Sequence, residues 1–323
     1  MTLPRHRKLS AFYRRAFGGR VHKVGLRGGF DCPNRDGTIS SGGCAFCNPE
    51  AALPPDTDPG VTVTRQLERG SARIRRRYGA EMFVAYFQDR TATYGDPARL
   101  ERLCLEAIGF PGVVGLSLGT RPDCLPEEVL DLLERLAPKT FLEVELGVQT
   151  ACDATLASIN RGHDSASIRR AFAALAERGI RTSAHVVLGL PGEGTGEIEA
   201  TASLLRECGA AGVKLHNLHV LRDTALESSF HSGEILPPSL EEYAAMAVRF
   251  LELTSPEAVV QRLVGDAPPD FLVAPDWMRD KQRAVGRIMK LLEERDTWQG
   301  RGLGCSREEV CRPVVFASGP GSP

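Results

Sequence analysis

Short apolar runs alternate with amphipathic segments along most of this chain. Each run has the length of a buried strand, and the runs lie at 81–87, 113–118, 141–148, 182–188 and 212–220, with a sixth expected near 23–27. The segments between them show the apolar spacing of helices, at 64–78, 97–108, 126–136, 165–178 and 196–208. Apolar strands that alternate with helices are typical of a parallel sheet covered by helices. The pattern predicts an α/β fold, a partial (β/α)6 TIM-like barrel.

The alternation stops after about residue 230. Two further helices are expected at 239–253 and 277–295, with one candidate strand between them at 258–264. We therefore divide the chain into a basic N-terminal arm (1–20), the barrel (21–230), a C-terminal α-rich extension (231–300) and a tail (301–323). The tail is rich in Gly and Pro, and we expect it to be disordered. Its Cys305 and Cys311 are interpreted as free thiols rather than as ligands of a second cluster or metal.

Polar residues recur where the expected strands end. They lie at 88–94, 119–123, 147–150 and 189–193 and at His219. In a barrel of this kind the chemistry takes place at the carboxyl ends of the strands. Any one of these segments could be a helix cap or a turn, but packing alone hardly explains their recurrence at one end of successive strands. We expect the functional site at that end.

Three cysteines lie in the loop after the first expected strand: Cys32, Cys44 and Cys47. The next one, Cys104, is far along the chain inside a helical segment. A structural zinc site is closed by four ligands, and a four-iron cluster normally has one cysteine for each iron. Three ligands therefore indicate a cluster with one iron left open for a small molecule. The glycines and Pro33 of the loop suit a chain that wraps around an inorganic group.

Other interpretations of these cysteines stay open on the residues alone. A disulfide is one, although nothing marks the chain as secreted. Zinc is another, with His22 or Asp31 as the fourth ligand, although neither residue has the usual zinc-ligand spacing. Three unrelated thiols are the third, but structural cysteines usually have apolar neighbours, and these lie among polar and glycine residues.

The composition is that of a globular protein, with 323 residues of which 42% are hydrophobic and 25% charged. No apolar run approaches a membrane span, and no apolar segment follows the basic N-terminus. We expect a soluble, cytoplasmic protein without membrane contact. The net charge of −1 conceals two basic clusters, which could follow a phosphate backbone or form a solvated face. The first contains Arg5, Arg7, Lys8, Arg14, Arg15, Arg20, Lys23 and Arg27, and the second Arg65, Arg69, Arg73, Arg75, Arg76 and Arg77.

Six motifs follow one another in the chain. They are GFDCPNRDGT (29–38), CAFC (44–47), GTRPDCL (119–125), ELGVQT (145–150), INRGH (159–163) and HVVLGLPGE (185–193). With them, residues 8–300 resemble the radical S-adenosylmethionine (SAM) superfamily, and most of all its YhcC/YtqA-like branch, which is related to the catalytic subunit of Elongator. The gap between Cys32 and Cys44 is longer than in most of the superfamily, but it is usual in this branch. Gly119 stands where some distant relatives carry a Glu that touches SAM.

The resemblance implies a cofactor pair and a mechanism. Cys32, Cys44 and Cys47 would hold a [4Fe–4S] cluster whose open iron binds the amino and carboxylate groups of SAM. One electron from the reduced cluster would cleave SAM into methionine and a 5′-deoxyadenosyl radical, which abstracts a hydrogen from the substrate. The difficult chemistry belongs to the cofactors, and the protein places the substrate and excludes water. An electron donor such as flavodoxin or ferredoxin is expected as a partner.

The resemblance also assigns SAM-binding residues by position. Gln88, Thr91 and Thr93 match contacts to the SAM amino group, and Thr120 lies at the end of the next strand. Gln149 and Arg161 match contacts to the ribose and the carboxylate, and a guanidinium suits a carboxylate because its donors form a fork. His185 matches a ribose contact, although it could equally be a core histidine on a buried strand.

Three residues near the last expected strand are candidates for contact with the substrate. Lys214 and His216 are two positions apart, so their side chains share one face of the strand, and they matter if that face is the barrel interior. His219 is out of phase with them but ends the strand. Relatives in the Elongator group act on the wobble uridine of transfer RNA, and the basic clusters agree with transfer RNA as the partner. The alternatives are a small-molecule or peptide substrate, and a non-catalytic metal-holding RNA-binding module that binds no SAM.

Overall fold

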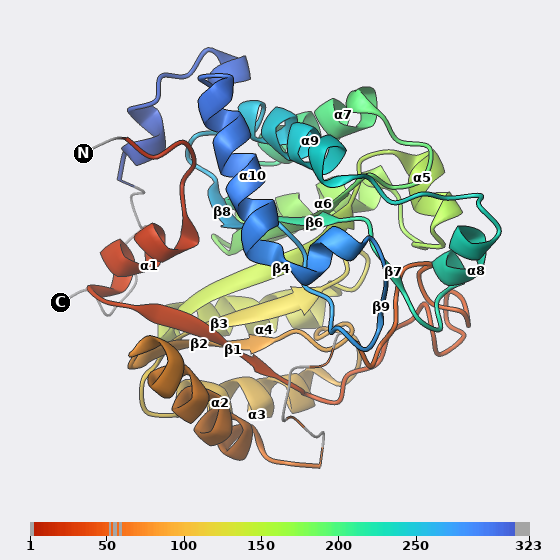
Figure 1. The fold of residues 1–323 in the computed structure, drawn as a ribbon. Helices are drawn as coiled ribbons and strands as arrows, with labels where there is room; N and C mark the ends of the chain where they lie inside the picture. Colours follow the sequence, from red (N-terminus) through yellow and green to blue (C-terminus); the bar gives the residue numbers. More distant parts are fainter. Residues whose placement is uncertain (1–2, 52, 54–56, 58–59, 314–323) are drawn as a thin grey trace.

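The structure is a computed structural model that describes residues 3–51, 53, 57 and 60–313. Seven parallel strands form one sheet that curls into a half-barrel (Figure 1). Their order in the sheet is β1 (Val21–Leu26), β2 (Met82–Phe87), β3 (Val113–Thr120), β4 (Phe141–Gln149), β5 (Arg181–Leu188), β6 (Gly212–Asn217) and β8 (Val259–Arg262). The predicted α/β partial barrel is confirmed, and it has one strand more than we expected. The seventh strand, β8, comes from the candidate at 258–264 and extends the sheet by pairing with β6.

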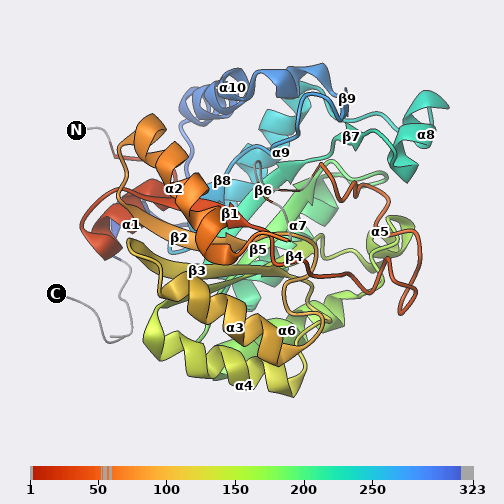
Figure 2. The ribbon, with the colours of Figure 1, turned by 90° about the horizontal axis from the view of Figure 1, so that it is seen from below.

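Helices cover the convex face of this sheet (Figure 2). They are α2 (Val63–Tyr78), α3 (Pro97–Ile108), α4 (Glu127–Leu136), α6 (Ser165–Glu177), α7 (Thr195–Glu207) and α9 (Leu240–Glu252), with α10 (Lys281–Glu294) packed on α9. The short α5 (Asp153–Ser158) follows the carboxyl end of β4. Outward side chains of the strands, such as Leu26, Phe83 and Leu118, are completely buried under this layer. This burial is the main source of the stability of the fold.

The inner face of the half-barrel is polar. Strand β4 shows the alternation: Leu142, Val144 and Leu146 pack into the helix-covered core, whereas Glu143 and Glu145 bind polar side chains of other strands across the barrel. Successive side chains of a strand point to opposite faces, so this part of β4 is apolar on one side and polar on the other. The inner face thus supplies charged groups to the space at the carboxyl ends of the strands.

Both ends of the described chain pack against the amino ends of the strands. Helix α1 (Leu9–Phe17) places Phe12 and Tyr13 against Val84 and Val259. We expected disorder throughout 301–323, and this is wrong for 301–313, where two short 3-10 helices (Arg301–Leu303 and Glu309–Cys311) form. The Arg7 guanidinium fixes this segment by donating to the backbone oxygen of Glu309 at 3.0 Å. Residues 314–323 of the predicted tail lie outside the described residues.

A second, small sheet joins the end of the barrel segment to the C-terminal extension. Strands β7 (Val220–Leu221) and β9 (Leu272–Ala274) pair antiparallel, and α8 (Ala225–His231) follows β7. The strand expected at 212–220 therefore ends at Asn217, and His219 lies in the link to β7. None of the helices in the described part of the chain has the length and apolar composition that a membrane crossing needs.

Candidate active site

The loop with the three cysteines leaves the carboxyl end of β1 and is held by backbone hydrogen bonds. The N–H of Arg35 donates to the oxygen of Cys32 at 2.8 Å, and the N–H of Cys47 donates to the oxygen of Cys44 at 2.9 Å. The start of the loop is fixed by the buried carboxylate of Asp89, which accepts the N–H groups of Gly28 and Gly29 at 3.0 and 2.9 Å. Asp89 follows β2, so two neighbouring strands position the loop.

A third contact fixes the far side of the same loop. The N–H of Ala45 donates to the oxygen of Ile159 at 2.9 Å. The side chain of Asn160 donates to the oxygen of Gly43 at 2.7 Å, and the side chain of Asn34 donates back to the oxygen of Asn160 at 2.5 Å. The INRGH motif is therefore a support for the cysteine loop, and it places Arg161 beside the cysteines.

One cavity collects most of the residues predicted from the sequence. Its walls include all three cysteines and six of the seven residues assigned to SAM, namely Gln88, Thr91, Thr120, Gln149, Arg161 and His185. The seventh, Thr93, is not on the wall. Its hydroxyl lies 2.5 Å from that of Thr120 and donates to the backbone oxygen of Cys124, so Thr93 supports Thr120 from behind.

The donor set fits an iron–sulfur cluster better than a single metal ion. All nine cysteines are among the described residues, and none forms a disulfide. No three Cys, His, Asp or Glu side chains in the described ranges are placed to bind one ion. Zinc would need its sulfurs about 2.3 Å from a common centre, whereas a cluster distributes its cysteines over different irons. His22 is the second residue of β1, at the opposite end of the strand, and Asp31 pairs with Arg90 at 2.7 Å, so neither is left as a zinc ligand.

Two arginines present unused donors to this cavity. The Arg161 side chain places one nitrogen 3.2 Å from the Cys44 sulfur and donates from another to the Gly147 oxygen at 2.8 Å, while its buried Nε has no partner among the described residues. Arg121 pairs with Asp123 at 2.7 Å, and its buried Nη1 is likewise without a partner within the described ranges. Buried donors are normally satisfied. The SAM carboxylate is an acceptor of the right charge for both.

The end of β4 is shaped to make room for these groups. Gln149 has a left-handed backbone with φ of 70°, at a register shift between β4 and β5. Such a conformation costs a residue with a side chain about 1–2 kcal/mol, and it tends to persist where function requires it. A Cβ on Gly147 would lie 2.5 Å from the Arg161 guanidinium and 2.9 Å from the Gln149 amide. The GVQ sequence thus allows both side chains to enter the cavity.

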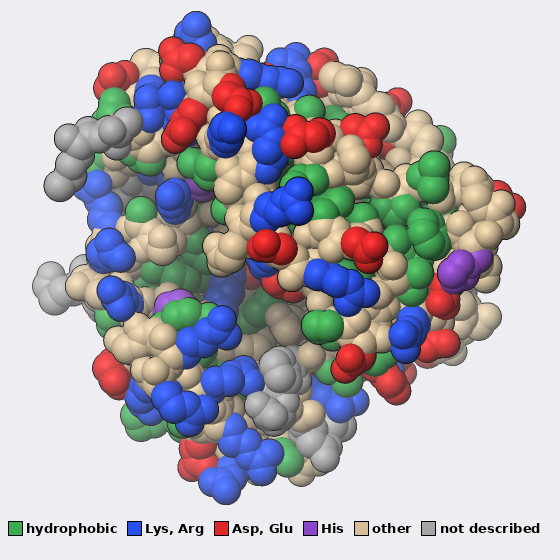
Figure 3. Space-filling model, in the orientation of Figure 1, with side chains coloured by type: hydrophobic (Ala, Val, Ile, Leu, Met, Phe, Trp, Pro, Cys, Tyr) green, Lys and Arg blue, Asp and Glu red, His purple; other side chains and the backbone are tan. Residues whose placement is uncertain are grey.

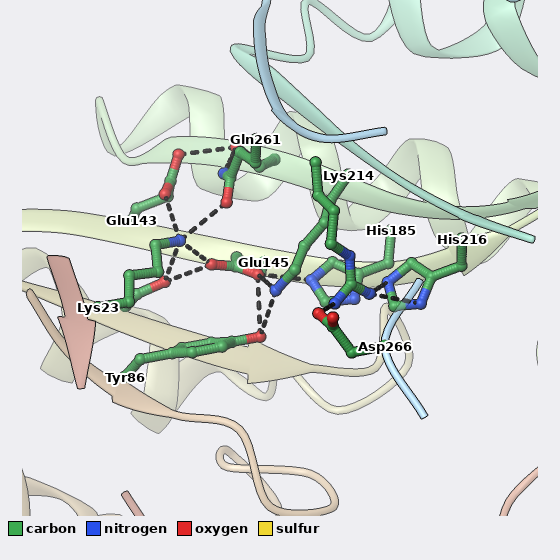
Figure 4. A network of polar contacts seen from close by, with 12 residues as sticks. Lys23, Tyr86, Glu143, Glu145, His185, Lys214, His216, Gln261 and Asp266 are labelled. Atoms are coloured by element: carbon green, nitrogen blue, oxygen red, sulfur yellow. Dashed lines mark hydrogen bonds and ion pairs between the residues drawn. The ribbon is translucent and has the colours of Figure 1, made fainter. Parts of the chain in front are cut away.

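A buried carboxylate connects the cavity to the barrel interior (Figure 4). Glu145 is completely shielded from solvent and accepts from Ser117 at 2.7 Å, Tyr86 at 2.9 Å, Lys214 at 2.9 Å and His185 at 2.5 Å, and it also pairs with Lys23. Burial opposes its ionisation, but the two lysines outweigh burial and hold the pKa of Glu145 well below its ordinary value. Glu145, Tyr86 and His185 all line the cavity.

This carboxylate also sets the hydrogen-bonding role of His185. Burial lowers the pKa of His185 to about 4, so the imidazole is neutral at neutral pH. A neutral imidazole beside an ionised carboxylate donates its Nε2–H to it, which leaves Nδ1 as an acceptor. His185 can therefore accept a hydrogen bond from a ribose hydroxyl, as its predicted role requires. It is more than a core histidine, because it lines the cavity.

The three candidate substrate residues are not on the cavity wall. Lys214 and His216 do point into the barrel interior, as Figure 4 shows, where Lys214 binds Glu145 and His216 contacts Arg262. His219 lies apart from them, with Nδ1 3.0 Å from the oxygen of Asn217. The prediction that Lys214 and His216 share one inner face agrees with the structure. Their contact with the substrate stays a prediction, as does that of His219.

Four residues of the site were not singled out from the sequence. Tyr86, Arg121 and Glu145 line the cavity, and Asp89 fixes the cysteine loop. One signal was available for Glu145: a carboxylate inside an otherwise buried strand is rarely tolerated unless it is paired. No sequence signal identified its partners, because they come from β1, β2, β3, β5 and β6.

Comparison with known proteins identifies the class. Residues 36–205 match the radical SAM superfamily, and residues 210–294 match the Radical_SAM C-terminal domain. The chain is 37% identical over 291 residues to Protein YhcC of Escherichia coli (strain K12), covering 90% of this chain and 93% of that protein. It is 36% identical over 313 residues to the uncharacterized protein YtqA of Bacillus subtilis, covering 95% and 96%.

More distant similarities concern parts of larger proteins. The tRNA uridine(34) acetyltransferase of Dehalococcoides mccartyi is 29% identical over 179 residues, which cover 53% of this chain and 38% of that protein. Among solved structures, the archaeal Methanocaldococcus infernus Elp3 with an N-terminal deletion has a TM-score of 0.66 at 16% identity. The match covers 86% of this chain and 64% of that chain, and it shows a common fold.

The half-barrel with three cysteines at the carboxyl end of its first strand defines an enzyme of the radical SAM class. The chain belongs to the radical SAM superfamily, as its matches to the family and to YhcC and YtqA show. Enzymes of this family use a [4Fe–4S] cluster and SAM, and these are the cofactors of this protein. The predicted family, enzyme class and cofactors are confirmed, and the roles of individual residues stay predictions.

Arg161→Ala is expected to weaken SAM binding without removing the cluster. Losing one charge-assisted pair should cost about 1.5–3 kcal/mol, or about 10- to 150-fold in Kd. The measurement is SAM binding to anaerobically reconstituted protein with its iron content checked. Arg169→Ala, which removes an exposed guanidinium paired with Glu207, should bind SAM normally. Unchanged SAM affinity in a fully clustered Arg161 variant would refute the role of Arg161.

Proposed function

We propose that this radical SAM enzyme modifies transfer RNA, at the side chain of the wobble uridine. The observation that carries the proposal is a set of arginines on α1 and α2 that have no acidic partner. Support comes from the partial similarity to a protein named tRNA uridine(34) acetyltransferase. That similarity concerns about half of this chain, so it supports the substrate class rather than a particular reaction.

The basic clusters of the sequence divide into two kinds in the structure. Some members have structural roles: Arg5 pairs with Asp296 at 3.1 Å, Arg7 and Lys23 are mostly buried, and Arg75 pairs with Glu81 at 2.7 Å. Five of the remaining members are exposed and make no ion pair with any described residue: Arg14, Arg15, Arg69, Arg76 and Arg77. Figure 3 shows Lys and Arg side chains gathered over α1 and α2 on this face. Unpaired guanidinium groups in such a cluster are free to bind phosphates.

The chain's own residues have definable tasks in this reaction. When bound, the cluster and SAM supply the radical that abstracts a hydrogen atom from the substrate. Cys32, Cys44 and Cys47 would hold the cluster, and the Arg161 and Arg121 donors would bind the SAM carboxylate. Glu145 keeps His185 oriented toward the cavity. The half-barrel around them excludes water, which would quench a radical or compete for these donors.

The uridine must leave its stack to reach this cavity. The cavity is a recess at the carboxyl ends of the strands, and an enzyme that acts on a base takes it out of the helix or binds it in a single-stranded loop. Lys214 and His216 lie deeper in the barrel beyond Glu145. We place the modified side chain of the base on that side of the cavity, within reach of the polar inner face.

The substrate class is tested by comparing transfer RNA from cells with and without the gene. Nucleoside mass spectrometry is expected to show a change confined to wobble uridines, because the radical acts on one positioned nucleotide. Cells that carry the Cys44→Ala variant are the control for catalysis, and they should match the deletion strain. Identical wobble-uridine profiles in all strains that make the protein would contradict the proposal and favour a small-molecule or peptide substrate.

The basic surface is tested separately by binding. In the double variant Arg69→Gln/Arg76→Gln, affinity for transfer RNA should fall. The slope of log K against log salt should become less steep by about two, since about one counterion is released per phosphate contact. The matched control is Arg206→Gln/Arg295→Gln, two exposed arginines on α7 and after α10. If both pairs change the affinity equally, the charge on α2 has no special role.

A further inference from the structure

We infer that a pocket at the amino ends of β1 and β2 is a second RNA site, which binds backbone phosphates and one unpaired base of the transfer RNA. The pocket lies among α1, the start of β1 and the end of α2. The inference rests on the proposed function, because the ligand is taken to be the same RNA that carries the modified uridine. It adds a site remote from the cysteines, on the opposite end of the sheet.

The pocket has the size and charge for a nucleotide. Its volume is about 600 Å³, and none of its eight lining residues is acidic. Three of them are arginines: Arg14 on α1, Arg20 before β1, and Arg77 in the last turn of α2. The nearest acid in sequence, Glu81, already pairs with Arg75 at 2.7 Å. A concave surface with three guanidinium groups and no carboxylate is a site for an anion such as a phosphate.

The arginines are positioned but not neutralised. The Arg20 guanidinium donates to the backbone oxygen of Tyr78 at 3.0 Å, which fixes its place in the wall. Within the described ranges Arg14 and Arg77 make no ion pair, and the guanidinium of Arg77 lies 5.1 Å from the centre of the Tyr78 ring. Arginine is the side chain whose forked donors match phosphate oxygens. The pocket therefore has unused phosphate-binding capacity.

An aromatic pair makes the site specific for a nucleic acid rather than for any anion. The rings of His22 and Tyr78 are stacked, with centres 4.4 Å apart and an angle of 14° between their planes. Tyr78 is 40% exposed, although such a residue usually contributes stability by being buried. Sites for single-stranded nucleic acids combine a basic groove with aromatic rings on which bases stack. A base that continues the His22–Tyr78 stack would leave its phosphates among the three arginines.

The distance to the active site predicts which RNAs can use the pocket. Strand β1 has six residues, so its two ends are about 20 Å apart at 3.3 Å per residue. The cysteine loop follows the carboxyl end of β1, and the pocket lies at the amino end. Nucleotides of a helical strand rise about 3.4 Å each along the helix axis, so a stacked RNA must extend at least about six nucleotides beyond the modified uridine to contact both sites. A full transfer RNA satisfies this condition, and a short loop fragment does not.

The test compares two RNAs and two kinds of variant. The RNAs are unmodified full-length transfer RNA and a three-nucleotide loop fragment centred on the wobble uridine, and the variants are made in clustered, full-length protein. For full-length RNA, Tyr78→Ala should lower the affinity about 5- to 150-fold with an unchanged salt slope, since one stacked base and no charge is lost. Arg14→Gln/Arg77→Gln should lower the affinity. It should also reduce the steepness of log K against log salt by about two, because two phosphate contacts are lost. The loop fragment should bind all of these proteins equally.

Two control variants separate stacking and charge from folding. Tyr78→Phe keeps the ring and should retain the affinity for full-length transfer RNA. Arg206→Gln, an exposed arginine on α7, should also be neutral. Full-length binding that is unchanged by Tyr78→Ala and by the double arginine variant would overturn the second site while leaving transfer RNA as the substrate. An equal loss for the loop fragment would overturn it as well, because the site would then not be remote.

The remaining outcomes concern the ligand class. If wild-type protein binds transfer RNA no better than a DNA duplex of similar charge, both the substrate proposal and the second site fail. If the same variants abolish binding to vesicles of anionic phospholipid while transfer RNA binding is unaffected, the pocket is a membrane contact and the RNA inference is wrong. Variant-sensitive binding of full-length transfer RNA alone supports the inference.

Discussion

Replacement of any one of Cys32, Cys44 or Cys47 by alanine is expected to abolish the cluster and all cleavage of SAM. A cluster with three protein ligands has no spare cysteine, because the next cysteines in the chain belong to helices or to other loops. The wild-type protein should bind about four iron and four sulfide ions per chain after anaerobic reconstitution. The loss should be complete in each variant, both in iron content and in visible absorbance.

The control for this experiment is a cysteine outside the cavity. Cys208, at the C-terminal end of α7, is half-buried and lies apart from the cysteine loop, so Cys208→Ala should take up the cluster and cleave SAM like the wild type. Product analysis with SAM and a reductant measures the cleavage, and metal analysis measures the cluster. One equivalent of zinc without iron uptake in anaerobically purified wild-type protein would contradict the assignment of these three cysteines.

The fold was predictable because the outer face of each strand is apolar. Val144, Leu146 and Val148 of β4 are 0% exposed, and β2 is buried along nearly its whole length, so both strands stand out in the sequence as short apolar runs. The seventh strand was harder to assign. Strand β8 has four residues and lies among helices of the C-terminal segment, so only its pairing with β6 shows that it belongs to the barrel.

The cysteine loop and its neighbours were predictable because their motifs are contiguous. The basic clusters were not resolved by sequence alone, because a count of arginines does not show which are paired. Arg7 and Lys23 are used inside the structure, and Arg14 and Arg77 face a pocket, yet all four have the same charge in the sequence. The second site depends on contacts between α1, β1 and α2, so no local pattern could indicate it.

The inner-face network was missed for the same physical reason. Its members are isolated polar positions on six different strands, and they meet only when the sheet curls (Figure 4). Glu145 is the member on which the others depend, because it pairs with both Lys23 and Lys214. Lys23 has a second carboxylate in Glu143 at 3.3 Å, whereas Lys214 has an ion pair with Glu145 alone among the described residues.

Glu145→Gln is therefore expected to be strongly destabilising. It leaves the buried Lys214 ammonium without a counter-charge, and removing one partner of a buried ion pair costs about 3–5 kcal/mol. In the wild type, burial lowers the pKa of Lys214 to about 8 and Glu145 opposes that shift, so the variant should push Lys214 further toward its neutral form. The free energy of unfolding of the cluster-free proteins, measured in urea at pH 7, should fall by this amount. SAM cleavage should fall too, since His185 loses the carboxylate that orients it.

The pH dependence follows from the direction of the Glu145 shift. The pKa of this carboxyl is depressed in the folded state, so its contribution to stability is complete above the ordinary value of about 4.3 and is lost as the pH falls through the lower folded value. The part of the difference between wild type and Glu145→Gln that comes from ionisation of Glu145 should be constant above about pH 6 and should shrink only in acid. Any change of the difference near neutral pH should come from Lys214, whose pKa the variant lowers further. If the difference in the free energy of unfolding between the two proteins instead disappears between pH 6 and 7, a group other than Glu145 is responsible for it.

Two variants identify the buried charge as the cause. Glu199→Gln removes an exposed carboxylate that pairs with Arg249 at 2.7 Å, and it should change the free energy of unfolding by less than about 1 kcal/mol. The double variant Glu145→Gln/Lys214→Met removes the stranded ammonium along with its partner, so it should recover part of the lost stability. A Glu145→Gln protein as stable as Glu199→Gln would show that the buried ion pairs of Glu145 contribute no more to the free energy of unfolding than an exposed ion pair does.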